Sequence, residues 1–260
     1  MIRHRNTTIR AILLDLDGVL YVGDQLIRGA PEAVAALREQ GMALAGVTNT
    51  TTRPRRAIGE KLETMNIPIH EDGLFTPAAL AVQIIGNAGA CLFVRESVRE
   101  DFRGVKENDT RPDYVVMGDV GGEGYSPEML RRIFGMVMDG AKLLALHKNR
   151  FWQKPDGLHL DLGPFVAAIE YATGCEATVP GKPSQAFFHG ICGKLNVAPE
   201  ESLMVGDDIE SDIGGAQQAG LKTALVQTGK YREEFVRKTG IRADLVLPSI
   251  ADLPDALHLL

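Results

Sequence analysis

The chain has 260 residues, of which 45% are hydrophobic and 24% are charged, which is enough apolar material for one or two globular domains. Its formal net charge of −6 argues against nucleic acid or an anionic membrane as a partner. Three scattered cysteines give neither a disulfide framework nor a zinc site, and no apolar run approaches the ~18 residues of a membrane helix, so we expect a cytoplasmic protein.

Strand and helix patterns alternate at both ends of the chain. Apolar runs predict strands over 11–16 and 43–50, and amphipathic stretches predict helices over 29–42 and 53–67. The alternation resumes with strands over 202–208, 222–228 and 243–249 and a helix over 211–220. Such alternation implies right-handed crossovers, so we predict an α/β fold with a Rossmann-like, doubly wound parallel sheet.

The middle of the chain carries a separate α/β pattern. Strands are predicted over 90–96, 113–118 and 142–147, and helices over 126–140 and 163–174. We therefore predict an inserted α/β domain over 83–178 within a core formed by 1–82 and 179–260.

Polar residues follow the predicted core strands where each strand ends. The first strand is followed by Asp15 and Asp17, the second by Thr48 and Asn49, and the strand over 202–208 ends in Asp207 and Asp208. The carboxyl ends of parallel strands share one edge of the sheet, which is where ligands bind in such folds. These residues therefore predict a site at that edge.

Taken alone, the Asp15–Asp17 pair has other interpretations. A calcium loop would need glycine at the sixth position and glutamate at the twelfth, where the chain has Leu20 and Leu26, so that interpretation fails. Solvated surface acids stay possible for the pair, as do a simple turn at Thr48–Asn49 and a surface lysine at Lys182. The order of all these residues along the chain favours a functional site.

Four stretches, "DLDGVL" (15–20), "VTNTT" (47–51), "GKPS" (181–184) and "GDDIESD" (206–212), resemble the four motifs of the haloacid dehalogenase superfamily, whose members are mostly phosphatases. The resemblance implies a Mg²⁺-dependent phosphatase with Asp15 as nucleophile, forming an aspartyl-phosphate, and Asp17 as general acid and base. It implies further roles for the following residues: Asp15, the Asp17 carbonyl and Asp207 as metal ligands; Asp17, Gly18, Thr48, Asn49 and Lys182 as phosphate-binding groups; and Asp208 and Asp212 as supports behind them.

The spacing of the motifs resembles one branch of this superfamily. One helix and one strand fill the interval between Asp15 and Thr48, whereas the interval between Thr48 and Lys182 holds the predicted inserted domain. This arrangement is similar to subfamily IIA, which has a large α/β cap between the second and third motifs and includes 4-nitrophenylphosphatase-like, pyridoxal phosphate and nucleotide phosphatases. A cap of this kind excludes water and selects a small phosphorylated metabolite as substrate.

Residues 143–183 and "GKYREE" (229–234) resemble the phospholysine phosphohistidine inorganic pyrophosphate phosphatases. That animal sub-branch commonly has serine where this chain has Asp17, and an acid there favours ordinary phosphate esters. Pyrophosphatase or phosphoamidase activity is the alternative. In the cap, the basic stretch 147–154 predicts a substrate loop through His147, Lys148 and Trp152, with a solvated hairpin as the other interpretation. The resemblance also suggests a homodimer formed through the cap.

Two further functions are weighed against the phosphatase. A dehalogenase would use the same nucleophile, but a leaving halide needs no acid, and Asp17 argues against it. A regulatory phospho-acceptor, like a response-regulator receiver, also combines acidic residues with a threonine and a lysine. The core of such a receiver is shorter, and its phosphorylated aspartate lies on a later strand. In this chain, moreover, Asp17 provides a means to hydrolyse an acyl phosphate on Asp15.

Overall fold

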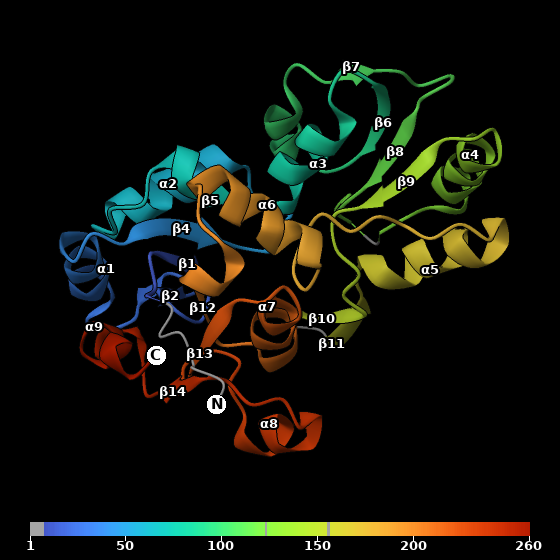
Figure 1. The fold of residues 1–260 in the computed structure, drawn as a ribbon. Coiled ribbons are helices and arrows are strands. Elements are labelled where there is room, and N and C mark those ends of the chain that lie inside the picture. The colour runs from blue at the N-terminus through green and yellow to red at the C-terminus, as the bar shows by residue number, and fades with distance from the viewer. Residues whose placement is uncertain (1–7, 123, 155–156) are drawn as a thin grey trace, which may run out of the picture. The chain divides into compact units, whose positions relative to one another are not determined.

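The computed structural model describes residues 8–122, 124–154 and 157–260 (Figure 1). The chain separates into two compact units. The first comprises the residues up to Thr48, Arg56–Phe75 and Lys182–Leu260, and the second comprises Asn49–Arg55 and Thr76–Gly181. The boundary expected between residues 82 and 83 falls inside helix α3 (Pro77–Ile85), whose buried side chains pack within the second unit.

The first unit is built on a six-stranded sheet with the order β14–β13–β12–β1–β4–β5, and every neighbouring pair is parallel. The strands are β1 (Ala11–Asp15), β4 (Ala43–Val47), β5 (Leu74–Phe75), β12 (Ser202–Gly206), β13 (Lys222–Val226) and β14 (Leu245–Leu247). Strand β1 lies between β12 and β4 and is buried along its whole length. The predicted α/β class and parallel Rossmann-like sheet are confirmed.

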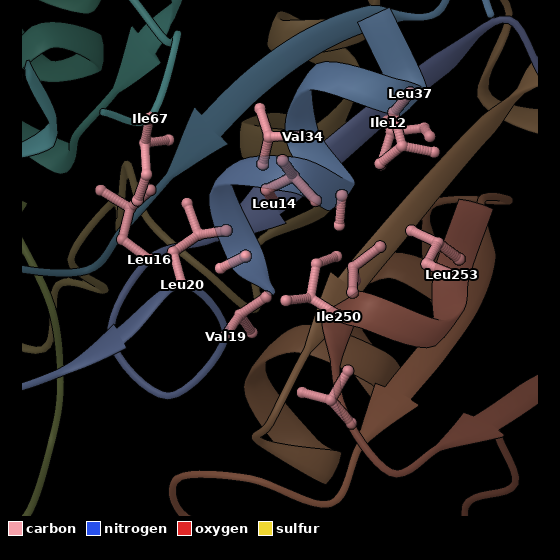
Figure 2. Packing of buried hydrophobic residues seen from close by; sticks show 14 of the residues in the cluster. Ile12, Leu14, Leu16, Val19, Leu20, Val34, Leu37, Ile67, Ile250 and Leu253 are labelled. Atoms are coloured by element: carbon pink, nitrogen blue, oxygen red, sulfur yellow. The ribbon is translucent and has the colours of Figure 1, made fainter. Parts of the chain in front are cut away.

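One face of this sheet is covered by α1 (Ala30–Glu39), α2 (Arg55–Thr64) and α9 (Leu253–Ala256). Helix α1 has a proline near its start and buries Val34 and Leu37 from one side. Figure 2 shows Val34 beside Leu14 of β1, and Leu37 beside Ile12 of the same strand, in the apolar cluster. Because successive side chains of a strand point to opposite faces, Asp15 lies on the other face of the sheet from Leu14.

That other face is covered by α6 (Gln185–Leu195), the π-helical segment Ile209–Gly214 and α7 (Gly215–Gln218). Helix α6 buries Phe187 and Phe188, and Ile213 of the π-helical segment packs against Leu225 of β13. Helix α8 (Glu233–Thr239) completes the unit. The structure thus places Asp15 on the face that also receives the 209–214 segment.

A small antiparallel hairpin follows β1 directly. It consists of β2 (Tyr21–Val22) and β3 (Gln25–Leu26), each only two residues long. We refer to it as the Tyr21–Leu26 hairpin.

The second unit contains a four-stranded parallel sheet with the order β7–β6–β8–β9. Its elements are β6 (Gly89–Phe93), β7 (Lys106–Glu107), β8 (Tyr114–Met117), β9 (Lys142–Ala145), α4 (Pro127–Met138), α5 (Leu162–Thr173) and an antiparallel hairpin of β10 (Phe151–Lys154) and β11 (Gly157–Leu160). Ser126 caps α4 by accepting a hydrogen bond from the Met129 N–H at 3.2 Å. The three strands and two helices predicted here are confirmed, with their ends shifted by a few residues.

Among the residues that the structure describes, no helix is both long and apolar enough to cross a membrane.

Packing on α1 generates a stability prediction. Leu37 is fully buried in the cluster of Figure 2, so Leu37→Ala is expected to lower the free energy of unfolding by about 2–5 kcal/mol through lost burial and a residual cavity. Leu259→Ala is the control, because Leu259 is 65% exposed, and it should change the free energy by less than about 0.5 kcal/mol. Urea denaturation measures both, and equal effects would contradict the packing described here.

Candidate active site

Four charged side chains from distant parts of the sequence meet at the carboxyl end of β1. Asp15 is the last residue of that strand, Asp207 directly follows β12, Asp212 lies in the π-helical segment, and Lys182 precedes α6. All four belong to the first unit and all are buried. The parallel order β12–β1 brings the ends of the two strands side by side, as the sequence predicted.

Lys182 is the centre of this group. Its Nζ atom lies 2.5 Å from Asp15 Oδ1 and 2.7 Å from Asp212 Oδ1. The other Asp212 oxygen accepts a hydrogen bond from the Asp208 backbone N–H at 3.1 Å. Both Asp212 oxygens are therefore engaged with the protein, so Asp212 fixes the lysine that contacts Asp15.

Three carboxylates against one ammonium leave the cluster with excess negative charge. One oxygen from each of Asp15, Asp207 and Asp212 lies within 4.8 Å of the others. Asp207 Oδ2 accepts the Lys230 backbone N–H at 2.6 Å, whereas its buried Oδ1 accepts no hydrogen bond from the described residues. Hard oxygen ligands, excess negative charge and a buried unpaired oxygen fit Mg²⁺, which Asp15 and Asp207 would hold.

Burial controls the protonation of these groups. It is the main cause that raises the pKa of Asp15 to about 7, helped by the charges of Asp212 and Asp207 and opposed by Lys182. It likewise raises the pKa of Asp207 to about 6. Burial alone would lower the pKa of Lys182, but its two carboxylate partners outweigh that effect and raise it, so this side chain is an ammonium ion.

A loop after β13, which the sequence patterns did not single out as part of the site, closes around Asp207. Thr228 Oγ1 donates to the Gly18 carbonyl oxygen at 2.5 Å, and the Lys230 N–H reaches Asp207. A Cβ on Gly229 would lie 2.1 Å from Asp207 Oδ2, so only glycine allows this approach. The available signal was the Thr-Gly pair after a predicted strand, directly before the stretch "KYREE".

Asp17 and Gly18 lie in the turn between β1 and the Tyr21–Leu26 hairpin. The Asp17 side chain is exposed. The Gly18 N–H donates to the Tyr21 carbonyl oxygen at 2.7 Å, and the predicted role of Gly18 in binding phosphate stays a prediction. Gly18 also contributes space, because a Cβ there would lie 1.9 Å from Asp207 Oδ2.

Asp208 has a structural task. Its Oδ1 accepts the N–H groups of Glu210 and Ser211 at 3.1 and 3.0 Å and so caps the π-helical segment, while Oδ2 lies 3.4 Å from Lys230 Nζ. Burial raises the pKa of Asp208, but these donors and the lysine outweigh it, so its pKa is lowered and the carboxyl group is ionised. The predicted supporting role of Asp208 thus corresponds to a helix cap.

Thr48 and Asn49 are neighbours in the sequence but belong to different units. Thr48 is buried at the end of β4, and its backbone N–H donates to the Phe75 carbonyl oxygen at 3.1 Å. Asn49 belongs to the second unit. Their role in binding phosphate stays a prediction.

The three cap residues proposed for substrate binding also belong to the second unit. His147 is buried, with Nε2 at 3.7 Å from Asp161 Oδ1, and burial outweighs nearby acids in lowering its pKa. Lys148 Nζ lies 2.8 Å from Glu170 Oε2. The side chain of Trp152 lies outside the described part of the chain. His147 and Lys148 therefore both have acidic partners within the protein.

Comparisons with known proteins show the family of the chain. Family models described as Haloacid dehalogenase-like hydrolase and HAD-hydrolase-like match residues 12–105 and 179–253. The chain is 39% identical to Haloacid dehalogenase-like hydrolase domain-containing protein 2 of Bos taurus, covering 86% of each chain, and 35% identical to the phospholysine phosphohistidine inorganic pyrophosphate phosphatase of Rattus norvegicus, covering 97% and 96%. The crystal structure of a 4-nitrophenylphosphatase from Thermotoga maritima matches with a TM-score of 0.87 and 25% identity, covering 96% and 97% of the two chains.

The close approach at Gly18 predicts a selective effect on metal binding. Gly18→Ala should displace Asp207 and raise the Mg²⁺ dissociation constant by about tenfold or more, as loss of ligand support does at metal sites. Gly41→Ala is the matched control, because Gly41 also has a positive φ but nothing lies within 4 Å of its Cβ position. It should cost about 1 kcal/mol of stability and leave Mg²⁺ affinity unchanged. Calorimetric titration with Mg²⁺ distinguishes the two.

The raised pKa values of Asp15 and Asp207 predict how Mg²⁺ stabilises the protein at different pH. Both values exceed 3.8, so the folded metal-free protein binds more protons than the unfolded chain, and its stability falls as pH rises from about 4 to about 7. Because Mg²⁺ binds the ionised carboxylates, the rise in melting temperature on adding it should be larger at about pH 7.5 than at about pH 5.5.

Thermal melts with and without MgCl₂ at the two pH values make this measurement. Asp207→Asn removes one of the proposed ligands and should abolish the difference. An equal rise at both pH values in the unmodified protein would show that the cluster is not the binding site.

Proposed function

Because the chain belongs to the haloacid dehalogenase-like hydrolases and is a phosphatase of their subfamily IIA, we propose that it hydrolyses a small phosphorylated metabolite, using Mg²⁺ and an aspartyl-phosphate on Asp15. The observation that carries this proposal is the contact of Lys182 with Asp15, beside an Asp207 oxygen that accepts no hydrogen bond from the described part of the chain. A buried carboxylate held by an ammonium is positioned as a nucleophile toward an anionic ester.

Asp15 acts first. One of its carboxylate oxygens attacks phosphorus, a new O–P bond forms, and the bond between phosphorus and the leaving oxygen breaks. Lys182 holds Asp15 Oδ1 at 2.5 Å and supplies positive charge next to the transferring phosphoryl group. Asp15 and Asp207 would hold Mg²⁺, and the bound ion would supply positive charge that lowers the repulsion between the carboxylate and the anionic substrate.

Asp17 handles the protons. In the first step, its protonated carboxyl group donates a proton to the leaving oxygen. In the second step, the resulting carboxylate takes a proton from the water that attacks phosphorus. The O–P bond to Asp15 then breaks, which releases inorganic phosphate and restores both carboxyl groups. The exposed position of the Asp17 side chain supports this exchange with water and substrate.

The second candidate is hydrolysis of pyrophosphate or of a phosphorylated lysine or histidine. It is favoured by the 35% identity to a phospholysine phosphohistidine inorganic pyrophosphate phosphatase over 97% of this chain. A panel of 4-nitrophenyl phosphate, pyridoxal phosphate, nucleoside monophosphates, sugar phosphates, pyrophosphate and phosphohistidine distinguishes the candidates. A kcat/KM value far above the others for pyrophosphate or phosphohistidine would replace phosphate esters as the proposed substrates.

Replacing the proposed nucleophile is the direct test. Asp15→Asn should lower the rate of Mg²⁺-dependent phosphate release by more than about 10⁴-fold, because the amide is a poor nucleophile and loses the charge paired with Lys182. Asp17→Asn should cost about 10²–10⁴-fold. Asp255→Asn, at an exposed position of the same unit, is the control and should retain full activity. Retained turnover in a pure Asp15→Asn protein would rule out the mechanism.

A further inference from the structure

The Tyr21–Leu26 hairpin follows the turn that carries Asp17, and of its residues Tyr21 alone is buried, in the apolar cluster of the first unit. Each strand has two residues, and the side chains of Val22 and Leu26 are 49% and 43% exposed. A two-stranded hairpin is marginally stable by itself in water. The exposed part of the hairpin, residues 22–26, therefore depends on a contact with another element.

Lys61 of α2 provides that contact. Its Nζ atom donates to the Gly23 carbonyl oxygen at 2.5 Å, lies 3.2 Å from Asp24 Oδ1, and sits 4.0 Å from the centre of the Tyr21 ring. The Lys61 side chain is only 16% exposed, whereas the Asp24 side chain is 88% exposed. The carbonyl and the ring are thus the sheltered partners of the ammonium, and the exposed ion pair adds little.

The hairpin in turn determines the backbone geometry around Asp17. Tyr21 forms an isolated β-bridge with Asp17, and its carbonyl oxygen accepts the Gly18 N–H at 2.7 Å. The Tyr21 N–H donates to the Leu16 carbonyl oxygen at 3.3 Å. Tyr21 therefore contacts both sides of the turn through its backbone and Lys61 through its ring.

We propose that Lys61 is a positioning residue for Asp17, acting through Tyr21 and without touching the substrate. This inference rests on the proposed function, in which Asp17 protonates the leaving oxygen. Without the ammonium the hairpin loses its contact with α2 at Gly23 and at the Tyr21 ring, and Asp17 then spends less time where it can donate its proton. The loss should be largest for substrates whose leaving group depends most on that proton.

Two substrates of similar shape test this dependence. 4-Nitrophenolate leaves without a proton, whereas the phenolate of phenyl phosphate is more basic and benefits from one. The value of kcat/KM reports only the steps up to formation of the aspartyl-phosphate, where Asp17 acts as the acid. A lower fraction of folded enzyme would reduce both kcat/KM values equally, so the ratio of the two isolates positioning.

Lys61→Met keeps a side chain of similar length without the charge. It is expected to lower kcat/KM about tenfold for phenyl phosphate and less than about threefold for 4-nitrophenyl phosphate, a part of the ~10²–10⁴-fold that a general acid supplies. Lys61→Arg should restore most of the loss. Lys222→Met is the matched control, because Lys222 pairs with Asp244 at the opposite end of the sheet, and it should change neither value.

Equal losses on both substrates, or no loss, would overturn the role of Lys61. If Lys61→Met does not fold, Tyr21→Leu replaces it, because it removes the ring that the ammonium contacts and keeps an apolar side chain and the backbone contacts of the turn, and the same preferential loss is expected. Asp17→Asn tests the general-acid role of Asp17 separately from the positioning role of Lys61. It should show the largest preferential loss, and if it shows none, the proposed acid is wrong whatever Lys61 does.

Discussion

The buried contact between Lys182 and two carboxylates is the interaction on which the rest of the site depends. Moving charges from water into a protein interior costs several kcal/mol per ion, and good geometry must offset that cost. The close contacts of Lys182 provide this geometry, because its Nζ atom lies 2.5 Å from Asp15 and 2.7 Å from Asp212. The Asp208 N–H then engages the second oxygen of Asp212. Asp15 is thus held by Lys182, Lys182 by Asp212, and Asp212 by the backbone N–H of Asp208.

The sheet makes this charge cluster compatible with a stable core. Leu14 of β1 packs against α1, whereas Asp15 points to the face covered by α6 and the π-helical segment. The alternation of side chains along a strand thus separates an apolar face from the polar end of the same strand. Because the carboxyl ends of β1 and β12 are neighbours, the pairing of the two strands brings Asp15 and Asp207 together.

The parts predictable from the sequence are those that repeat or form compact motifs. Strands β1, β4 and β12 and helix α1 were predicted to within a few residues, since each has a continuous apolar run or a helical period. Helix α6 was missed; Gly190 and Gly193 weaken its local propensity, and burial of Phe187 and Phe188 outweighs them. The Tyr21–Leu26 hairpin was missed because two-residue strands show no period.

The residues of the site also fall into those that the sequence identified and those that it did not. Asp15, Lys182, Asp207 and Asp212 stand in short motifs and were identified together. Thr228, Gly229 and Lys61 were not, because their parts in the site come from contacts over long sequence distances: Thr228 with Gly18, and Lys61 with Gly23. Such contacts leave no pattern in a single sequence. The contact of the Gly18 N–H with the Tyr21 carbonyl oxygen likewise joins a turn to a hairpin that the sequence patterns did not show.

The acidic side chains of the site differ in burial, and this difference matches the tasks that we propose for them. Asp15, Asp207 and Asp212 are buried, and a carboxylate that binds a cation or a lysine gains from an environment in which water does not compete. Asp17 is exposed, and the proton donor and acceptor that we propose it to be needs access to water and to the leaving group. A buried side chain is held by its packing, whereas an exposed one depends on its backbone. The precision of Asp17 therefore has to come from the turn and the hairpin that follow it, which is where Lys61 acts.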